Sequence, residues 1–300
     1  MSPKIGFIGL GQMGKWMALN VMQKGFDLTV ADIDPQAVEF LVERGAQSAR
    51  TPADLAGMTD WIFLSLPNAA IVEEVIWGPR GLVNNSRAGQ IVVDLGTTAY
   101  MATLECGAKL QEKGIIFADS PVSGMEARAK EGTLTIMYGG DEGVFRRLRP
   151  VFESFGDLIL YMGALGSGQL TKLINQLLFN ISAAAIAEIF PMAVKLGLDP
   201  EKVLRVVTTG TGRSFAAEFF GPRILQNRFA EGYALKHAYK DMVSAAEICA
   251  HKQIPLPMVH AATTTYQMAL AGGYGDEDKG AMIKVFENIL DVRFRAKGER

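Results

Sequence analysis

The sequence has few cysteines and histidines and no excess of charge of either sign. Its two cysteines, Cys106 and Cys249, lie far apart, so they neither make a metal cluster by themselves nor suggest a disulfide framework. We therefore expect a reducing, cytoplasmic location. With 30 Lys and Arg against 32 Asp and Glu, the net charge of −2 argues against a nucleic-acid partner.

No stretch of the chain predicts a membrane span. The longest apolar region, residues 173–194, is interrupted by Asn175, Gln176, Asn180 and Glu188. A helix that crosses a lipid bilayer would have to bury these polar side chains. We expect a helix buried in protein instead, and no membrane partner.

Apolar runs alternate with helical stretches in the first half of the chain, which predicts a doubly wound parallel sheet with right-handed crossovers. Two later runs extend the same sheet. The expected strands cover residues 4–9, 27–32, 61–66, 91–95, 115–119, 133–138 and 157–161. The expected helices cover residues 13–23, 36–43, 70–76, 102–113 and 144–152.

The pattern changes after a glycine-rich linker at residues 163–168. The following residues are helical in pattern, beginning with one long helix over 169–197 that Pro191 should kink or shorten. Later helices are expected at residues 200–208, 238–252, 259–271 and 281–290. We predict a Rossmann domain over residues 1–163 and an all-α domain over residues 164–300.

A dinucleotide fingerprint follows the first expected strand: Gly9, Leu10, Gly11, Gln12, Met13 and Gly14. Gly9 permits a tight turn, Gly11 lets the backbone approach a pyrophosphate, and Gly14 lets the helix pack on the strand. Asp32 ends the second strand, where its carboxylate can accept hydrogen bonds from ribose hydroxyls. The alternative is an ordinary tight turn with a surface aspartate.

Asp32 favours NAD over NADP, because a 2′-phosphate would lie against its charge and residues 33–36 offer no Arg or Lys. Two further segments at strand ends are expected to contact the nicotinamide half. They are Leu66-Pro67-Asn68 and Gly96-Thr97-Thr98. Routine turn chemistry explains these residue types equally well.

Several motifs resemble those of the β-hydroxyacid dehydrogenase family, which includes 3-hydroxyisobutyrate dehydrogenase and tartronate semialdehyde reductase. The resemblance covers essentially the whole chain. It is carried by residues 6–14, 119–124 (Asp-Ser-Pro-Val-Ser-Gly), 132–137 and 166–175, and by Lys240-Asp241.

The resemblance implies a small 3-hydroxy acid as substrate and an active site in the cleft between the two domains. Ser123 and Gly124 would hold the substrate carboxylate, and Lys172 would exchange the hydroxyl proton. Lys240 would close over the nicotinamide, near which Thr97 would also lie. Members are usually dimers or tetramers that assemble through the helical domain.

The residues themselves also favour Lys172 as the acid–base group. It lies in the first turns of an apolar helix, where a lysine without a function is costly to bury, and its pKa would have to fall towards neutrality. The alternative is a lysine that extends to solvent from the helix end. The histidines, His237, His251 and His260, belong to no recognisable motif and are expected at the surface or in packing.

Two positions depart from the family pattern. Gln176 stands where the family has Asn four residues after the lysine, with Asn175 one place earlier, and we assign both to substrate binding. Met125 stands where a second glycine is common. Arg213 could pair with a second carboxylate, although a solvated arginine is the simpler interpretation, and Phe215 is expected in the core.

The leading hypothesis is therefore an oxidoreductase that transfers a hydride between NAD(P) and a small 3-hydroxy acid or its semialdehyde. No metal site is expected. One alternative is a catalytically silent dinucleotide-binding scaffold or sensor, against which the retained Lys172 and the lack of a basic tail argue. Another alternative is an imine reductase, a neighbouring branch that usually carries a different residue at this position.

Overall fold

The computed structural model describes residues 3–298, which divide into two compact units, the first ending at Lys172 and the second beginning at Leu173. The first unit contains a nine-stranded sheet, β3-β2-β1-β4-β5-β6-β8-β7, with β9 paired to β8. Its strands are β1 (Ile5–Ile8), β2 (Leu28–Ala31), β3 (Gln47–Ser48), β4 (Trp61–Leu64), β5 (Ile91–Asp94), β6 (Ile116–Asp119), β7 (Val122–Ser123), β8 (Leu134–Gly139) and β9 (Gly156–Gly163).

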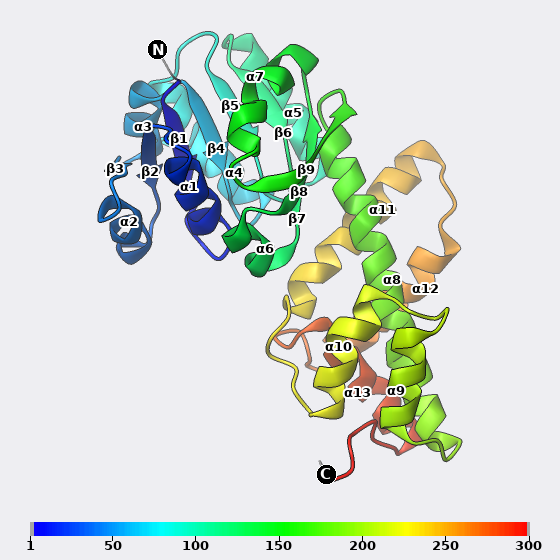
Figure 1. Ribbon diagram of the computed structural model, residues 1–300. Helices are drawn as coiled ribbons and strands as arrows, with labels where there is room; N and C mark the ends of the chain where they lie inside the picture. The colour runs from blue at the N-terminus through cyan, green and yellow to red at the C-terminus, as the bar shows by residue number, and fades with distance from the viewer. Residues whose placement is uncertain (1–2, 299–300) are drawn as a thin grey trace. The chain divides into compact units, whose positions relative to one another are not determined.

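Helices connect these strands and lie against both faces of the sheet (Figure 1). They are α1 (Gly14–Gln23), α2 (Pro35–Val42), α3 (Pro52–Met58), α4 (Ala69–Trp77), the 3-10 helix η1 (Leu82–Asn84), α5 (Tyr100–Glu112), α6 (Met125–Glu131) and α7 (Glu142–Phe152). Two separate apolar clusters, one around Phe7 and Phe152 and one around Ile62 and Leu110, fill the two faces.

The sheet confirms the predicted Rossmann fold, with one correction of direction. Strands β1 to β6 are parallel, and the strand order reverses between β1 and β4. The predicted extension by residues 133–138 does join the sheet, but β8 runs antiparallel to β6 and β7, and β9 is parallel to β8. Residues 120–133 contain only a two-residue strand and a short helix, so the chain turns back beside β6 instead of crossing over.

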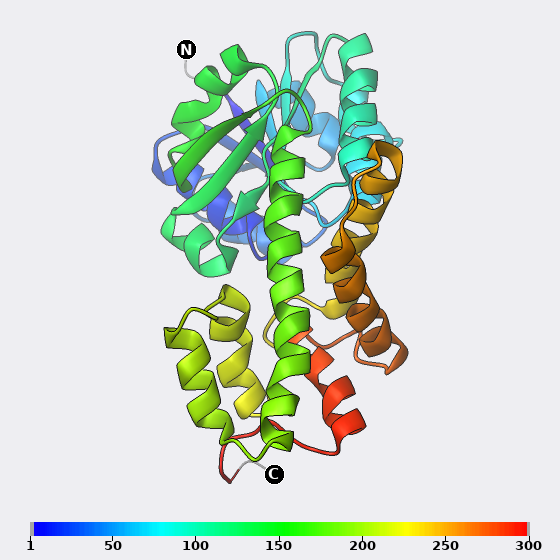
Figure 2. The same cartoon turned by 90° about the vertical axis from the view of Figure 1, so that its right-hand side faces the viewer.

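The second unit is helical, as the sequence predicts. It begins within α8 (Ser167–Lys195), which Figure 2 shows as one continuous helix, and the first turns of this helix belong to the first unit. Its other elements are α9 (Pro200–Thr209), α10 (Phe215–Leu225), α11 (Leu235–Lys252), α12 (Pro257–Ala271), the 3-10 helix η2 (Lys279–Met282) and α13 (Ile283–Leu290).

Helix α8 does not end at Pro191, so the expected shortening there is wrong. The residues around the proline are buried: Phe190 is 1% exposed and stacks on Phe294 with ring centroids 4.5 Å apart. This packing offsets the loss of one backbone hydrogen bond at the proline. By length and composition alone α8 could cross a membrane, a test that core helices of water-soluble proteins also pass.

Three short helices were not predicted. Helices α3 and α6 have seven residues each, too few for a clear helical period, and α10 contains the sequence Gly221-Pro222, which is typical of a turn. Phe220 and Ile224 of α10 are each 1% exposed and belong to the apolar core of the second unit. Tertiary contacts therefore override the local signal here.

Candidate functional site

The glycine-rich turn after β1 combines two glycines that the fold requires with one that it does not. A Cβ on Gly9, whose φ is +93°, would lie 2.3 Å from the carbonyl oxygen of Ser65, and one on Gly14 would lie 1.9 Å from that of Gly9. A Cβ on Gly11 would meet no atom of the described residues within 4 Å. The backbone at Gly11 is thus open to a ligand, beside the N-terminal amides of α1.

Asp32 lies directly after β2 and fixes this turn. Its Oδ2 accepts the backbone N–H of Leu10, and its Oδ1 accepts that of Asp34 at 2.8 Å. A carboxylate oxygen has a second lone pair, so Asp32 can still accept from ribose hydroxyls. The turn and Asp32 together fit the pyrophosphate and ribose of a dinucleotide, at the edge of the sheet where β1 and β4 diverge.

Two more loops leave the sheet at the same edge. A Cβ on Gly96 would lie 2.7 Å from the carbonyl oxygen of Leu66, so glycine at this position lets the loops after β4 and β5 approach closely. Pro67 and Asn68 are exposed, and Thr97 is half-buried. The Asn68 side chain accepts the N–H of Ile71 at 3.0 Å and caps α4, which explains the residue type without a ligand. Contact of these residues with a cofactor stays a prediction.

Gln169 connects the loop after β5 to α8. Its Oε1 accepts the N–H of Thr98 at 3.1 Å, and its Nε2 donates to the carbonyl oxygen of Gly96 at 2.9 Å. Asp94, which is fully buried, accepts the N–H of Gly96 at 2.8 Å and the hydroxyl of Thr98 at 2.6 Å. Neither role is predicted from the sequence, although Asp94 lies at the end of an expected strand.

The fully buried Asp119 caps the N-terminus of α8 from the neighbouring strand. Its two carboxylate oxygens accept the N–H groups of Gly166 at 2.6 Å and Gln169 at 2.7 Å. Burial raises the pKa of Asp119 to about 6, against the opposing effect of these hydrogen bonds. The resemblance included Asp119 in a substrate motif, and the structure shows that its side chain positions a helix.

The segment predicted to hold a carboxylate is a sharp turn between β7 and α6. Ser123 pairs with Thr135 of β8, and Gly124 has a φ of +145°, where its Cβ would lie 2.8 Å from the Cβ of Arg128. Met125 has a φ of +61°, a conformation that favours glycine, so the departure from the family pattern places strain here.

Lys172 lies on α8 and is 8% exposed, so most of its side chain is removed from solvent. On the same helix face, four and eight residues later, lie the half-buried Gln176 and the fully buried Asn180. Asn175 is exposed and lies about 100° around the helix from Gln176, so these two predicted substrate residues are not on one face.

In the second unit, Gln176 contacts the Lys-Asp pair of α11. Its Nε2 lies 3.3 Å from Oδ2 of Asp241, which is 4% exposed. Lys240 is half-buried beside it. The structure therefore brings together two motifs that are 64 residues or more apart in the sequence, Gln176 and Lys240-Asp241.

The other candidates lie at the surface. All three histidines are exposed, and Arg213 is solvated and pairs with Glu218 at 3.2 Å, as the simpler interpretation predicts. Phe215 is 55% exposed, so the expectation that it lies in the core is wrong. It lies at the first turn of α10, where its ring meets that of Phe179 edge-on and stacks on that of Phe219 instead.

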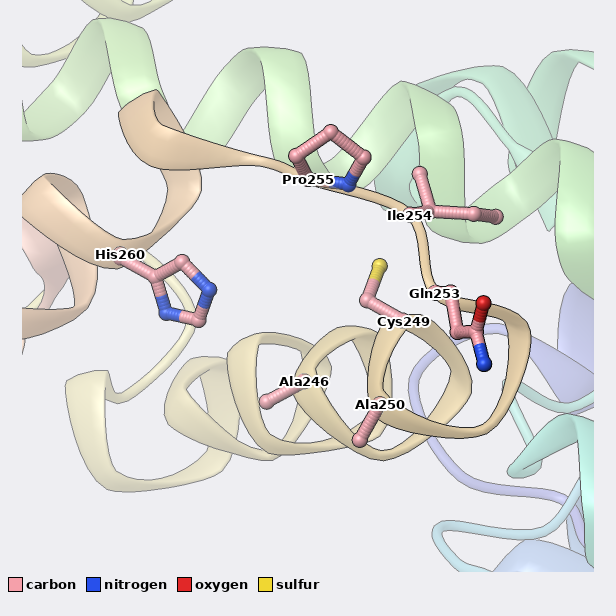
Figure 3. A pocket seen from close by; sticks show the side chains of 7 residues that line it. All are labelled: Ala246, Cys249, Ala250, Gln253, Ile254, Pro255 and His260. Carbon is pink, nitrogen blue, oxygen red and sulfur yellow. The ribbon is translucent and has the colours of Figure 1, made fainter.

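Residues 3–298 contain no group of three or more His, Cys, Asp or Glu side chains arranged to hold a metal ion. A pocket of about 440 Å³ lies between the end of α11 and the start of α12 (Figure 3). Cys249 and His260 point into it from opposite sides. It contains none of the predicted site residues.

Comparisons with known proteins agree with this geometry. A family model described as the NAD binding domain of 6-phosphogluconate dehydrogenase matches residues 4–163. A second, described as the NAD-binding domain of NADP-dependent 3-hydroxyisobutyrate dehydrogenase, matches residues 166–286. The chain is 39% identical to 2-(hydroxymethyl)glutarate dehydrogenase of Eubacterium barkeri, over 97% of each chain. The chain belongs to the β-hydroxyacid dehydrogenase family.

Other relatives support the same assignment. The 2-hydroxy-3-oxopropionate reductase of Escherichia coli is 34% identical over 95% of this chain and 97% of its own. A solved 3-hydroxyisobutyrate dehydrogenase from Salmonella typhimurium is 30% identical, with a TM-score of 0.86 over 95% of this chain and 100% of its own. This β-hydroxyacid dehydrogenase is thus an NAD(P)-dependent oxidoreductase of hydroxy acids. The imine reductase alternative is more distant: that of Myxococcus stipitatus shares the fold alone, at 19% identity and a TM-score of 0.64 over 95% of this chain and 99% of its own.

Gly11→Ala should change dinucleotide binding, whereas Gly14→Ala should change thermal stability. We expect Gly11→Ala to keep the thermal midpoint of the wild type but to raise the dinucleotide Kd at least tenfold, because its methyl group fills space that only the ligand needs. Gly14→Ala should lower the midpoint by several degrees, because its methyl group collides with the Gly9 backbone. Thermal unfolding and fluorescence titration with NADH measure both. Unchanged binding by Gly11→Ala would contradict the assignment of this turn.

Proposed function

We propose that this dehydrogenase oxidises a small 3-hydroxy acid, or reduces the corresponding semialdehyde, with Lys172 as the general acid–base group. The single observation that carries this proposal is the buried lysine on α8, fixed by a helix cap and followed by a polar helix face. A bound nicotinamide supplies or accepts the hydride. The chain must then move the hydroxyl proton, which an amine within hydrogen-bond reach can do.

The other residues bind and orient the substrate in this proposal. The Ser123 hydroxyl and the backbone amides around Gly124 offer donors for a carboxylate, on a turn made rigid by the pairing of β7 with β8. Gln176 orients the substrate next to Lys172, and its contact with Asp241 fixes its side-chain amide. Asn175 is a weaker candidate because it is exposed and lies about 100° around the helix from Gln176. Lys240 closes over the bound ring.

Lys172→Ala should lower kcat by about 10²–10⁴-fold, because a general acid–base group contributes rate enhancement of that order. Binding of NADH should remain within about twofold of the wild type. The measurement follows nicotinamide absorbance with a panel of 3-hydroxy acids, and Lys195→Ala, an exposed lysine of the same helix, is the control.

Unchanged turnover by Lys172→Ala would rule out the lysine as the base. The silent-scaffold alternative makes a different prediction for the wild type: it would bind NADH tightly but turn over no member of the panel.

NAD is the proposed cofactor. Asp32 presents a negative charge at the ribose position of the fingerprint, and the exposed residues after it, Ile33 and Asp34, carry no positive charge. A 2′-phosphate would therefore be repelled. We expect Asp32→Asn to lower the preference for NAD over NADP in kcat/KM by at least tenfold, while Asp34→Asn, the neighbouring cap of α2, leaves the ratio unchanged. A wild-type preference for NADP would contradict this proposal.

A homodimer or homotetramer is the proposed assembly. Apolar side chains follow the face of α8 opposite to its polar face and continue just beyond its end, and they are more than 45% exposed. They are Ile174, Leu178, Ile189, Met192 and, one residue after the helix, Leu196. Such an apolar stripe is typical of a surface covered by another chain.

Ile189→Glu should convert the assembly to monomers, measured by sedimentation, because it places a charge in the middle of this stripe. Val206→Glu, on the exposed face of α9, is the matched control. A monomeric wild type would refute the assembly.

We propose a functional division into residues 1–163 and 164–300, because the glycine-rich linker separates the sheet from α8. We propose a cytoplasmic location, supported by two free cysteines, Cys106 and Cys249, and testable by cell fractionation.

A further inference from the structure

The turn that is proposed to hold the substrate carboxylate is strained at Met125. Among the described residues of the first unit, Met125 is the only one other than glycine that has a positive φ, at +61°. A residue with a Cβ disfavours this left-handed conformation, and such strain persists only where the surrounding structure holds it. Contacts outside the turn must therefore hold Met125 in place.

Helix α6 follows this turn directly and is held against α1, the helix that begins at the glycine-rich fingerprint. Nε1 of Trp16 donates to Oε1 of Glu126 at 3.0 Å, in the first turn of α6. Towards the other end of α6, Nδ2 of Asn20 donates to the carbonyl oxygen of Ala129 at 2.9 Å. Glu126 is the residue after Met125, so the first of these hydrogen bonds acts next to the strained position.

Further contacts fix the indole that donates this hydrogen bond. Nζ of Lys15 lies 5.0 Å, and Nζ of Lys130 lies 4.8 Å, from the centroid of the Trp16 ring. An ammonium beside an aromatic ring is attracted to it, and Lys15 belongs to α1 whereas Lys130 belongs to α6. The edge-to-face contact of Trp16 with Phe40 of α2, with centroids 5.8 Å apart, orients the ring. The indole therefore binds groups from both helices in one defined orientation.

The ion pair that α6 makes on its other side is weaker. Arg128 pairs with Asp157 of β9 at 2.9 Å, and the two side chains are 41% and 55% exposed. Exposed ion pairs contribute little to stability. Trp16 and Glu126 are both half-buried, and a hydrogen bond to a carboxylate is stronger than one between neutral groups. The bond between Trp16 and Glu126 is thus the side-chain contact best placed to hold the turn.

We propose that Trp16 and Glu126 are positioning residues for substrate binding. Their hydrogen bond holds Met125 in its left-handed conformation, and so keeps the backbone of residues 123–125 in the shape that receives a carboxylate. The inference rests on the proposed function, which places the substrate carboxylate at Ser123 and Gly124. Neither positioning side chain touches the substrate in this role. Loss of their bond weakens carboxylate binding and leaves dinucleotide binding at the fingerprint intact.

The test measures carboxylate binding and dinucleotide binding separately. The inhibition constant of 2-methylpropanoate, which has the carboxylate but no hydroxyl group to oxidise, reports the first, and the Kd of NADH reports the second. Trp16→Phe and Glu126→Ala should raise this inhibition constant, and the KM of the best 3-hydroxy acid of the panel, about 3- to 10-fold. Both should leave kcat and the Kd of NADH within about twofold of the wild type. Glu126→Gln should rescue most of the loss, because its amide oxygen can accept from the indole.

Asp157→Asn is the matched control, because it weakens the exposed ion pair of α6 and should leave all of these values unchanged. A second experiment tests whether the bond acts through the strained residue. Glycine adopts a φ of +61° without strain, so in a protein that carries Met125→Gly the bond has no strain to hold. Trp16→Phe should then raise the inhibition constant of 2-methylpropanoate by less than about twofold, a non-additive effect that a general loss of packing does not produce.

The outcomes separate the two proposals. If Trp16→Phe and Glu126→Ala leave the inhibition constant and the KM unchanged, or if Trp16→Phe acts equally with and without Met125→Gly, the positioning role is wrong and the proposed reaction stands. If Trp16→Phe does not fold, the comparison of Glu126→Ala with Glu126→Gln decides between these results. If the wild type turns over no 3-hydroxy acid or semialdehyde of the panel, the proposed function fails and the positioning role falls with it.

Discussion

The chemistry proposed for this protein depends on one buried carboxylate that holds the beginning of one helix. Asp119 ends a central strand and accepts two backbone N–H groups at the N-terminus of α8. These amides have no partner within the helix itself, so the carboxylate satisfies donors that would otherwise be buried unpaired. Gln169 adds contacts with the loop after β5. The position of Lys172, less than one turn later, follows from these bonds.

Helix α8 has two faces with different roles. The face that carries Gln169, Lys172, Gln176 and Asn180 is polar and largely buried, and farther along it is closed by small residues, Ala183 and Ala187. The opposite face is apolar and exposed. The mean hydropathy of α8 does not reveal this division, because it averages the polar face and the apolar face. Its burial and its polar partners identify it as a helix of a folded domain.

In the glycine-rich turn, only some of the glycines are required by the fold. Gly9 and Gly14 make the strand–helix junction sterically possible, and Asp32 holds the turn through the amide of Leu10. Gly11 has no such structural role, because a Cβ there would meet no atom of the described residues within 4 Å. Gly96, in contrast, is required by the fold, because a Cβ there would collide with the backbone of Leu66.

The sequence alone determined the alternation of strands and helices, the fingerprint with Asp32, the helical second half and the candidate lysine. These signals are local: each depends on a period or a motif within about 30 residues. The sequence could not give the antiparallel direction of β8, the capping role of Asp119, or the positive φ of Met125. Nor could it show that Lys279 lies against Asn180, 99 residues away. These features depend on contacts between distant segments, and only the packed chain decides which polar groups are buried together.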